Sequence, residues 1–544
     1  MEKTARAVVL LLLFGLPTVG PLARESAPER DSIQAADLKR DVLILTSDEM
    51  NGRLVGTPGN RRAAEFITSR FEELGLRTVE PDDSYLSPIE LVQTALLPDT
   101  ALTLRWSDTE ETVELGDDFF PERFSATGRA QGPVVFAGFG ISAPSLAHDD
   151  YADGDIDGKV VLALDHEPEE FNAGSPFDGT LTSEHGRALR KALAAQRRGA
   201  VAVLFVADVH NHSSVPTIRA AMRTTWPETP RRVPHYQPAA WVDQLRIPAV
   251  RISPELADRI VRQRGETLET LAERAEAPGG ITPVDLPDVE VDLSASVEVQ
   301  RLTEYNVLGL IQGDDPELRN EWVILCAHLD HEGTRGARVF KGADDNASGV
   351  AGLLELAEAY ALAIRAGAPP RRSILFAVWN AEERGLLGAW AYTERPANPL
   401  DRTVAVINMD MIGRNEEVPA HGGRRFRGLE PQIATSNQNA VNILGYSYST
   451  DLRRASEAAN TELGLELRFR YDNNSSNLLR RSDHWPFLFK GVPAIFVHTG
   501  LHPDYHTERD LPEKLNYDKM TRIVRLVYQL SWDLAQADSR PSLN

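Results

Sequence analysis

The second half of the chain alternates between short apolar runs and longer segments with helical character. Three runs, at 323–327, 373–379 and 403–409, have the length and the apolar content of buried strands. Between the first two lies 350–366, an Ala- and Leu-rich segment made of good helix formers. Strands that alternate with helices predict an α/β fold, with a mixed, largely parallel sheet flanked by helices.

Acidic and imidazole side chains follow the ends of the predicted strands. Ligands of open α/β sheets bind beyond the carboxyl ends of the strands, so these side chains are expected to share one site. In chain order they are His328, Asp330, Asp345, Glu382, Glu383, Asp410 and His506.

The first half of the chain is predicted to contain a second unit. From about 128 the sequence has short strand-like runs, a basic helical segment and a long polar stretch, 207–247, that is typical of a loop. The segment 273–288 is rich in Ala, Gly and Pro and marks the return to the first unit. We therefore predict a discontinuous main domain, 33–127 and 281–540, with 128–280 as an inserted domain.

The inserted domain is expected to carry no chemistry. Its only conspicuous pair of candidate ligands is His210 and His212, which stand without an accompanying cluster and are interpreted as a detail of the loop rather than a metal site.

The first 23 residues have the features of a secretory signal peptide. Lys3 and Arg6 precede an apolar run, 7–17, which is too short to span a bilayer and is followed by small residues. This pattern predicts an exported protein without a stable membrane anchor.

The single cysteine, Cys326, lies inside a predicted strand and is interpreted as a small core hydrophobe rather than a nucleophile. One cysteine cannot form an intrachain disulfide, so stability is expected to come from packing and from bound metal.

Composition limits the classes of partner. The chain has 544 residues, of which 42% are hydrophobic and 25% charged, an ordinary globular composition with room for two or three domains. Its formal net charge is −22, which would repel nucleic acid and anionic membrane surfaces. Neither is expected as a partner.

The candidate site has the donor set of a metal centre. Taken singly, a His at a strand end, a Glu-Glu pair or an Asp-Asp-Asn turn is usually structural; their occurrence together at successive strand ends favours a shared function. Two imidazoles and three carboxylates suit zinc and could also hold cobalt or manganese. About this many ligands serve two divalent ions if one carboxylate bridges them. The five candidate ligands are His328, Asp345, Glu383, Asp410 and His506.

Two further acidic residues are assigned supporting roles. Glu382, next to a candidate ligand, is left over and is placed to act as a general base. Adjacent side chains of a strand point to opposite faces, so Glu382 and Glu383 can serve one site only if the strand has already ended. Asp330 is a plausible carboxylate partner for the His328 imidazole.

The motifs resemble those of the dinuclear zinc aminopeptidases of the bacterial leucyl aminopeptidase and aminopeptidase Y type, whose wider relatives include glutamate carboxypeptidase II, glutaminyl cyclase and the non-catalytic transferrin receptor. The matching motifs are His328-Leu329-Asp330, Gly342-Ala343-Asp344-Asp345-Asn346-Ala347-Ser348-Gly349, Ala381-Glu382-Glu383-Arg384-Gly385, Asn408-Met409-Asp410, Ser482-Asp483-His484 and Tyr505-His506.

The resemblance implies a zinc exopeptidase fold that binds two Zn²⁺ per chain. It implies that Asp345 bridges the ions, with Asp344 as the competing candidate, and that Glu382 is the base. One ion would be completed by Glu383 and His506, and the other by His328 and Asp410. The family motif usually carries a cis peptide bond after the bridging aspartate. The inserted block resembles a protease-associated domain.

The expected activity is that of an exported aminopeptidase acting on peptide substrates. A carboxypeptidase or another amidohydrolase on the same scaffold is the alternative, and it would need a basic cluster for a carboxylate terminus. The candidates for such a cluster are Arg414, Arg424, Arg425 and Arg427. A receptor-like module that has lost its metals is a further alternative, which the complete set of candidate ligands disfavours.

Overall fold

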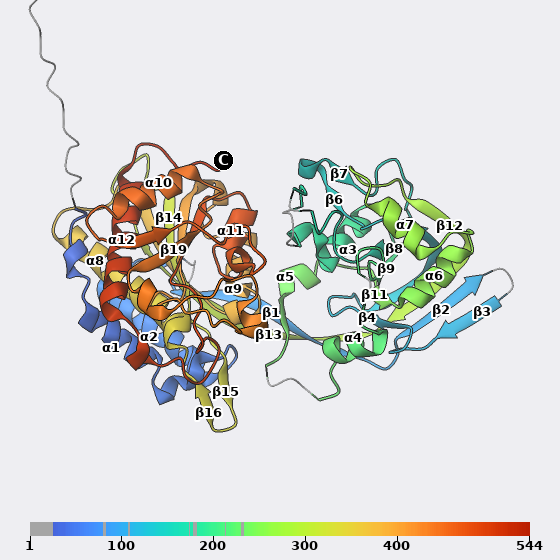
Figure 1. The fold of residues 1–544 in the computed structure, drawn as a ribbon, viewed down its shortest axis with the longest axis horizontal. Helices are drawn as coiled ribbons and strands as arrows, with labels where there is room; N and C mark the ends of the chain where they lie inside the picture. Colours follow the sequence, from blue (N-terminus) through green and yellow to red (C-terminus); the bar gives the residue numbers. More distant parts are fainter. Residues whose placement is uncertain are drawn as a thin grey trace, which may run out of the picture.

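A computed structural model describes residues 26–79, 83–106, 109–172, 174–177, 182–212, 214–229 and 233–544. The predicted signal peptide, 1–23, lies outside the described residues. Two lobes, each built around its own β-sheet, lie side by side (Figure 1).

The larger sheet has nine strands and forms the centre of the first lobe. In spatial order these are β10 (Tyr236–Pro238), β1 (Leu86–Leu96), β13 (Val297–Ile311), β17 (Ser373–Trp379), β14 (Trp322–His328), β18 (Thr403–Met409), β21 (Ala494–His498), β19 (Ala440–Leu444) and β20 (Glu466–Arg468). Strands β17, β14, β18 and β21 run parallel, whereas β13 and β19 flank them in the antiparallel sense. The predicted mixed α/β fold is confirmed, with its parallel part confined to the centre and to the β19–β20 edge.

Alternate residues of the central strands face two different layers of helices. Val323 and Leu325 of β14 pack in one apolar cluster, and Ile324 and Cys326 pack in another on the opposite face. The first face is covered by α1 (Ala35–Leu45), α2 (Pro58–Leu74), α8 (Gly349–Arg365) and α12 (Tyr517–Gln536), and the second by α9 (Leu387–Glu394) and α11 (Trp485–Phe489). Helix α10 (Thr450–Ala459) packs beside α12. Cys326 is fully buried in the core.

Helix α8 is unusually apolar because it is enclosed. Within the described part of the chain, 343–365 is the one helical segment long and apolar enough to cross a membrane, and most of it is buried inside the protein. A helix that is apolar on all sides and surrounded by protein is a core helix.

The second lobe contains an eight-stranded sheet. Its spatial order is β3 (Thr109–Val113), β2 (Ala101–Trp106), β12 (Val284–Ala295), β5 (Gly128–Phe136), β8 (Val160–Leu164), β9 (Ala202–Val206), β11 (Ala249–Ile252) and β4 (Phe119–Pro121). Helices of this part of the chain are α3 (Ala188–Arg197), α4 (Ile218–Thr225), α5 (Ala239–Val242), α6 (Pro254–Arg262) and α7 (Leu268–Ala275). Two small hairpins, β6 (Ser142–Ala143) with β7 (His148–Asp149) and β15 (Gly333–Arg335) with β16 (Arg338–Phe340), complete the strands.

The strand pairings place the limits of the inserted unit differently from the predicted 128 and 280. Strands β2, β3 and β4 precede 128 and β12 follows 280, yet all four pair in the second sheet. Conversely, β10 lies inside the predicted insert but pairs with β1 of the first sheet. The stretch 207–247, predicted to be a long loop, in fact contains α4, β10 and α5. Local apolar periodicity does not encode the partner of a strand, which depends on contacts between residues far apart in sequence.

Strands β1 and β13 connect the two lobes (Figure 1). They pair in register from Leu86 opposite Val307 to Leu96 opposite Val297, and Leu97 then donates a backbone hydrogen bond of 3.0 Å to Ser296. Apart from β10, the chain therefore leaves the first sheet at the end of this antiparallel ladder, forms the second sheet, and returns to the first sheet at the same point.

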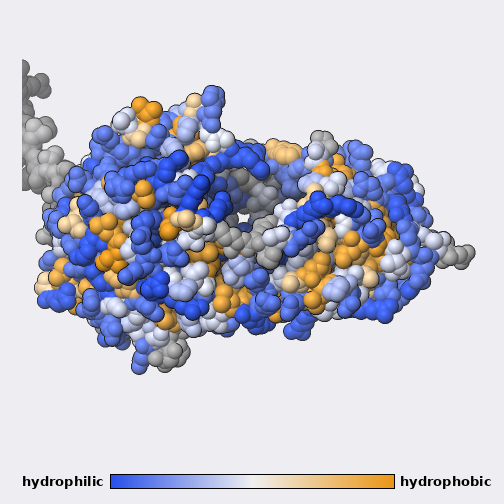
Figure 2. All heavy atoms as spheres, turned by 90° about the horizontal axis from the view of Figure 1, so that it is seen from below, coloured by the Kyte–Doolittle hydropathy of each residue, from blue (hydrophilic) through white to orange (hydrophobic). Residues whose placement is uncertain are grey.

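Side chains also cross between the lobes. The ring centroids of Trp241 and Trp390 lie 5.4 Å apart, and Arg190 stacks over Trp241 and Phe489. Hydrophilic residues predominate on the face of both lobes shown in Figure 2, with hydrophobic patches scattered between them.

We expect the true boundary of the insert to be the end of the β1–β13 ladder. Replacing 98–295 with Asn-Gly, a two-residue hairpin turn, should leave a soluble protein with a cooperative thermal transition, because Leu97 and Ser296 already form the hydrogen-bonded pair that such a turn needs. Deleting 128–280 instead would strip β12 of its β5 partner, so this protein should aggregate. Circular dichroism melts and size-exclusion chromatography compare the two; the opposite ranking would contradict the boundary.

Candidate metal centre

The predicted site residues meet at the carboxyl ends of the central parallel strands. His328 is the last residue of β14, Asp410 follows β18, and Glu382 and Glu383 begin a short 3₁₀ turn after β17. Asp345 lies in the turn Ala343–Ser348, which leads into α8. His506 comes from the loop after β21. Because the strands are parallel, residues separated by almost 180 positions are brought to one edge of the sheet.

Asp345 stands between two groups of side chains. Its Oδ1 lies 3.4 Å from His328 Nε2, which in turn lies 3.4 Å from Asp410 Oδ1. Its Oδ2 lies 2.9 Å from His506 Nε2, which lies 3.2 Å from Glu383 Oε2. The two oxygens of one carboxylate thus face two different His–carboxylate pairs, which is the arrangement that a bridging ligand requires.

Asp344, the competing candidate for the bridge, is oriented away from this position. Its Oδ1 accepts a 2.7 Å hydrogen bond from the backbone of Gly413, and its Oδ2 lies 3.3 Å from His502 Nε2. The two oxygens are therefore directed at Gly413 and His502, and the geometry favours Asp345 as the bridge.

The two adjacent glutamates reach the same site because β17 has ended before them. Ala381 has a left-handed backbone with φ of 58°, and the 3₁₀ turn that follows replaces the alternation of a strand. Glu382 Oε2 lies 3.8 Å from His328 Nε2 on one side, while Glu383 contacts His506 on the other. Ligand atoms of His328, Glu382 and Asp410 also lie within 4.8 Å of one another, so position alone does not distinguish Glu382 as base or ligand.

Electrostatics separates the two glutamates. Burial raises the pKa of Glu382 well above its ordinary value, and the nearby carboxylates of Asp483 and Asp410 raise it further against the opposing effect of His328. Burial acts on Glu383 in the same direction, but the interactions with His506 and His331 prevail and lower its pKa. Neighbouring carboxyl groups whose pKa values are driven apart are typical of sites that assign them different tasks.

Asp330 contacts the site in a different way from that predicted. Its carboxylate accepts backbone hydrogen bonds from Glu382 at 2.9 Å and Glu383 at 3.2 Å, and lies 3.8 Å from His328 Nδ1. The closer partner of His328 Nδ1, at 3.2 Å, is the backbone oxygen of Asp330. The chain turns after β14, so the side chain of Asp330 points to the glutamate turn. Burial raises its pKa to about 6.

The turn that carries Asp345 has the backbone that the resemblance implied. The Asp345–Asn346 peptide bond is cis. Gly342, just before the turn, has φ of +55°, and a Cβ there would approach Asp345 O to 2.2 Å and the His331 ring to 2.5 Å. Only glycine fits this position.

Three buried residues support the site although sequence reasoning did not single them out. His331 Nδ1 lies 2.8 Å from Glu383 Oε1. Its position in the His-Leu-Asp-His run could have identified it as a residue of the site. Asp510 accepts the backbone hydrogen bonds of Asp344 and Asp345. The guanidinium of Arg53 donates to the carbonyls of Leu329, Lys341 and Gly342. These contacts join residues almost 300 positions apart, so no local sequence pattern predicts them.

A cavity of about 300 Å³ opens onto the metal-centre residues. Its wall combines apolar side chains with three arginines, of which Arg480 and Arg481 come from the first lobe and Arg187 from the second. A larger cavity, about 560 Å³ near Met222 and Trp226, is lined by no carboxylate and lies away from these residues.

Buried imidazoles and carboxylates grouped around one aspartate, at the carboxyl ends of parallel strands, define an α/β protein with a candidate metal centre. Residues 306–531 match the model of Peptidase family M28. This segment contains all the predicted site residues.

Similar proteins bear peptidase names of two kinds. The chain is 25% identical over 523 residues to a probable glutamate carboxypeptidase VP8 of Zea mays, covering 91% of this chain and 64% of that protein. It is 40% identical over 137 residues to aminopeptidase NAALADL1 of Mus musculus, covering 24% and 17% of the two chains. It thus spans less than two thirds of the length of these relatives. A solved aminopeptidase from Aneurinibacillus sp. strain AM-1 has 19% identity, a TM-score of 0.47, and coverage of 94% and 96%.

We expect removal of the Asp330 carboxylate to weaken metal binding without removing a ligand. Asp330→Ala leaves the backbone N–H groups of both glutamates without their acceptor, so the apparent zinc affinity should fall by about 10- to 100-fold, as for other residues that orient metal ligands. Competitive zinc titration measures this loss. Asp314→Ala, at an exposed position, is the control, and an unchanged affinity in Asp330→Ala would refute the assigned role.

Proposed function

We propose that this protein is an exported dinuclear zinc aminopeptidase. The observation that carries the proposal is the position of Asp345 between the His328–Asp410 pair and the His506–Glu383 pair. The match of residues 306–531 to the model of Peptidase family M28 supports a zinc peptidase, and the donor set also accommodates cobalt or manganese. Export rests on the charged and apolar pattern of residues 1–23.

The residues present fit bound metal ions. His328 Nε2 and Asp410 Oδ1 are buried and have no hydrogen-bond partner among the described residues, although both point into the centre. Several carboxylates buried in one place also require nearby positive charge, since burial of unpaired anions is costly. Under the proposal, Asp345 serves both ions, His328 and Asp410 complete one site, and Glu383 and His506 complete the other.

Glu382 is the residue to which we assign proton transfer. Zinc in this centre would supply Lewis-acid polarisation of the scissile carbonyl and of water. The Glu382 carboxylate accepts a proton from the attacking water and donates it to the departing amine, which balances the hydrolysis. Its turn holds it beside the ligands without a hydrogen bond to either histidine, so its oxygens are available to solvent in the cavity.

Exchange of each glutamate for glutamine distinguishes ligand from base. Glu382→Gln keeps the shape but loses basicity, so zinc content should remain as in the wild type while kcat falls by about 10²- to 10⁴-fold, and added zinc should not restore it. Glu383→Gln weakens a ligand, so zinc content should fall and excess zinc should restore part of the activity.

Elemental analysis and turnover of an aminoacyl-nitroanilide measure the two effects on the same samples. If Glu382→Gln lost zinc while Glu383→Gln stayed loaded and inactive, the two roles would be reversed. A wild-type protein without bound metal would favour the receptor-like alternative.

A second candidate function, hydrolysis of substrates that carry a free carboxylate, is favoured by the three arginines of the cavity. The arginines proposed from the sequence do not line it: Arg414 pairs with Asp504 at 3.2 Å, and Arg424, Arg425 and Arg427 belong to an exposed segment. Arg187, Arg480 and Arg481 line the cavity instead.

The three arginines differ in how firmly they are held. Arg187 pairs with Glu184 at 2.7 Å, and Arg480 donates to the backbone oxygen of Thr182 at 2.7 Å and stacks on Trp485. Arg481 is exposed beside the same opening. A guanidinium binds carboxylates through paired hydrogen bonds, so this wall is suited to an acidic side chain or a C-terminus. Arg187 comes from the inserted unit, which resembles a protease-associated domain. We therefore propose that this unit takes part in substrate access.

We expect Arg481→Ala to separate the two candidate functions. Loss of a charge-assisted contact of about 1.5–3 kcal/mol should raise KM about 10- to 100-fold for peptides with a free carboxylate near the scissile bond. Neutral, C-terminally amidated peptides should be unaffected. Steady-state kinetics with matched peptide pairs measure the difference, and Arg427→Ala, on the exposed segment, is the control. Equal effects on both members of each pair would argue against carboxylate recognition.

A further inference from the structure

The second lobe contains a separate cluster of potential metal ligands, formed by two loops. One loop follows β8 and carries His166 and Glu170; the other follows β9 and carries His212. Strands β8 and β9 pair in parallel, up to Leu164 opposite Val206, so the loops leave the same edge of the sheet. This is the position at which open parallel sheets bind ligands.

The three side chains converge on one point. His166 Nδ1 lies 2.9 Å from Glu170 Oε2, and His212 Nε2 lies 2.5 Å from Glu170 Oε1. The two imidazole rings are 4.4 Å apart, centroid to centroid, at 37°. One ligand atom from each residue lies within 4.8 Å of the other two.

Glu170 faces both imidazoles from a nearly buried position. The glutamate is 8% exposed, and neither its Oε1 nor His212 Nε2 has a hydrogen-bond partner among the described residues, despite their 2.5 Å separation. A buried carboxylate whose two oxygens face two different imidazoles presents a donor set that a common cation can use.

Further residues hold both loops in this arrangement. The fully buried Asp208 accepts hydrogen bonds from the backbone of His210 and Asn211, and so shapes the loop of His212. Glu276, from the end of α7, accepts from the backbone of Glu169 at 2.7 Å and from the Asn211 side chain, and so ties one loop to the other. Such support behind candidate ligands is typical of metal sites.

The backbone of the first loop is also unusual. His166 and Glu169 adopt left-handed conformations, with φ of 60° and 55°. Residues other than glycine occupy this region at a cost and do so where the surroundings require it. Here the conformation directs His166 and Glu170 toward the same point as His212.

We propose that His166, Glu170 and His212 bind one divalent transition-metal ion of the zinc type, distinct from the metals of the catalytic centre. Two imidazole nitrogens and one carboxylate suit such an ion, and a water can complete a tetrahedral site. The sequence predicted that His210 and His212 stand without an accompanying cluster, but the structure brings His166 and Glu170 beside His212 from more than 40 residues earlier in the chain.

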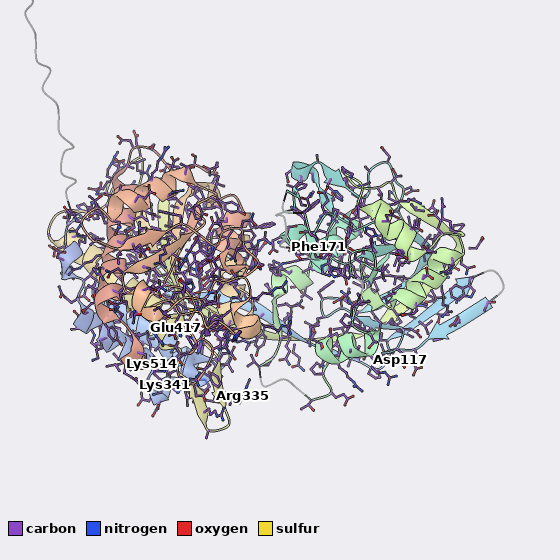
Figure 3. The ribbon with its side chains drawn as sticks, viewed as in Figure 1. Asp117, Phe171, Arg335, Lys341, Glu417 and Lys514 are labelled. Carbon is purple, nitrogen blue, oxygen red and sulfur yellow. The ribbon has the colours of Figure 1, made fainter. Side chains whose placement is uncertain are left out.

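The site is connected to the catalytic cavity through the loop that follows His166. Glu167, next to His166, accepts hydrogen bonds from the backbone and the hydroxyl of Ser183. Four residues on, Arg187 lines the catalytic cavity. Phe171, which is 65% exposed and packs edge-on to His212, lies on the side of the second lobe nearest the first in Figure 3. The ion thus stabilises the segment that presents Arg187.

Elemental analysis of the full-length protein tests the proposal. Wild type, Glu170→Gln, His212→Gln and the control His210→Gln are equilibrated in the same zinc-buffered solution and their zinc per chain is measured. His210 is exposed on the same loop but outside the cluster. Glu170→Gln and His212→Gln should hold one zinc fewer per chain than wild type and His210→Gln, because the catalytic ligands are unchanged in all four.

The comparison remains decisive if one variant misfolds. Circular dichroism identifies folded variants, and Glu170→Gln, which is nearly isosteric, is the variant least disturbed in shape. Equal zinc content in folded Glu170→Gln and wild type would overturn the proposal. A matching loss in His210→Gln would also overturn it, because the lost ion would then not depend on this cluster.

Discussion

The burial of several carboxylates in one place is the constraint around which this structure is organised. Asp330, Asp345, Glu382, Glu383 and Asp410 are all largely removed from water at one edge of the larger sheet. Unpaired anions in such a position would be strongly destabilising. Three features offset this cost. Imidazoles lie on both sides of Asp345, backbone N–H groups donate to Asp330, and the donor set suits divalent cations.

The architecture supplies this environment through strand direction. Only a parallel arrangement of β14, β17 and β18 places the end of every strand, and hence its polar residue, at the same edge. Turns then aim the side chains: the 3₁₀ turn after β17 lets Glu382 and Glu383 face one site, and the cis peptide bond follows Asp345. Arg53 holds the loops that flank His331 by donating to their carbonyl groups.

The same strand-end principle appears in the second lobe on a smaller scale. The loops that follow the parallel strands β8 and β9 bring His166, Glu170 and His212 together. The chain after β8 leads to Arg187, which lines the cavity at the candidate metal centre. Both lobes therefore contribute residues to the cavity at the candidate metal centre, with Arg187 coming from the second lobe.

The sequence alone determined the central strands and helix α8, and it named the residues that the structure brings together in the candidate metal centre, because each of these depends on local signals. Apolar runs followed within three residues by His328, Glu382 and Asp410 are readable without knowing which strands pair. The motif around Asp345 is similarly contiguous.

Tertiary structure decided the features that depend on partners distant in the chain. It showed that β2, β3, β4 and β12 belong to the second sheet, that the Asp330 carboxylate holds the glutamate turn, and that Arg187 reaches the cavity. It also joined His212 to Glu170. Hydrophobic periodicity records which face of a segment is buried, but the identity of the neighbour is set by long-range packing and hydrogen bonding, which no single segment contains.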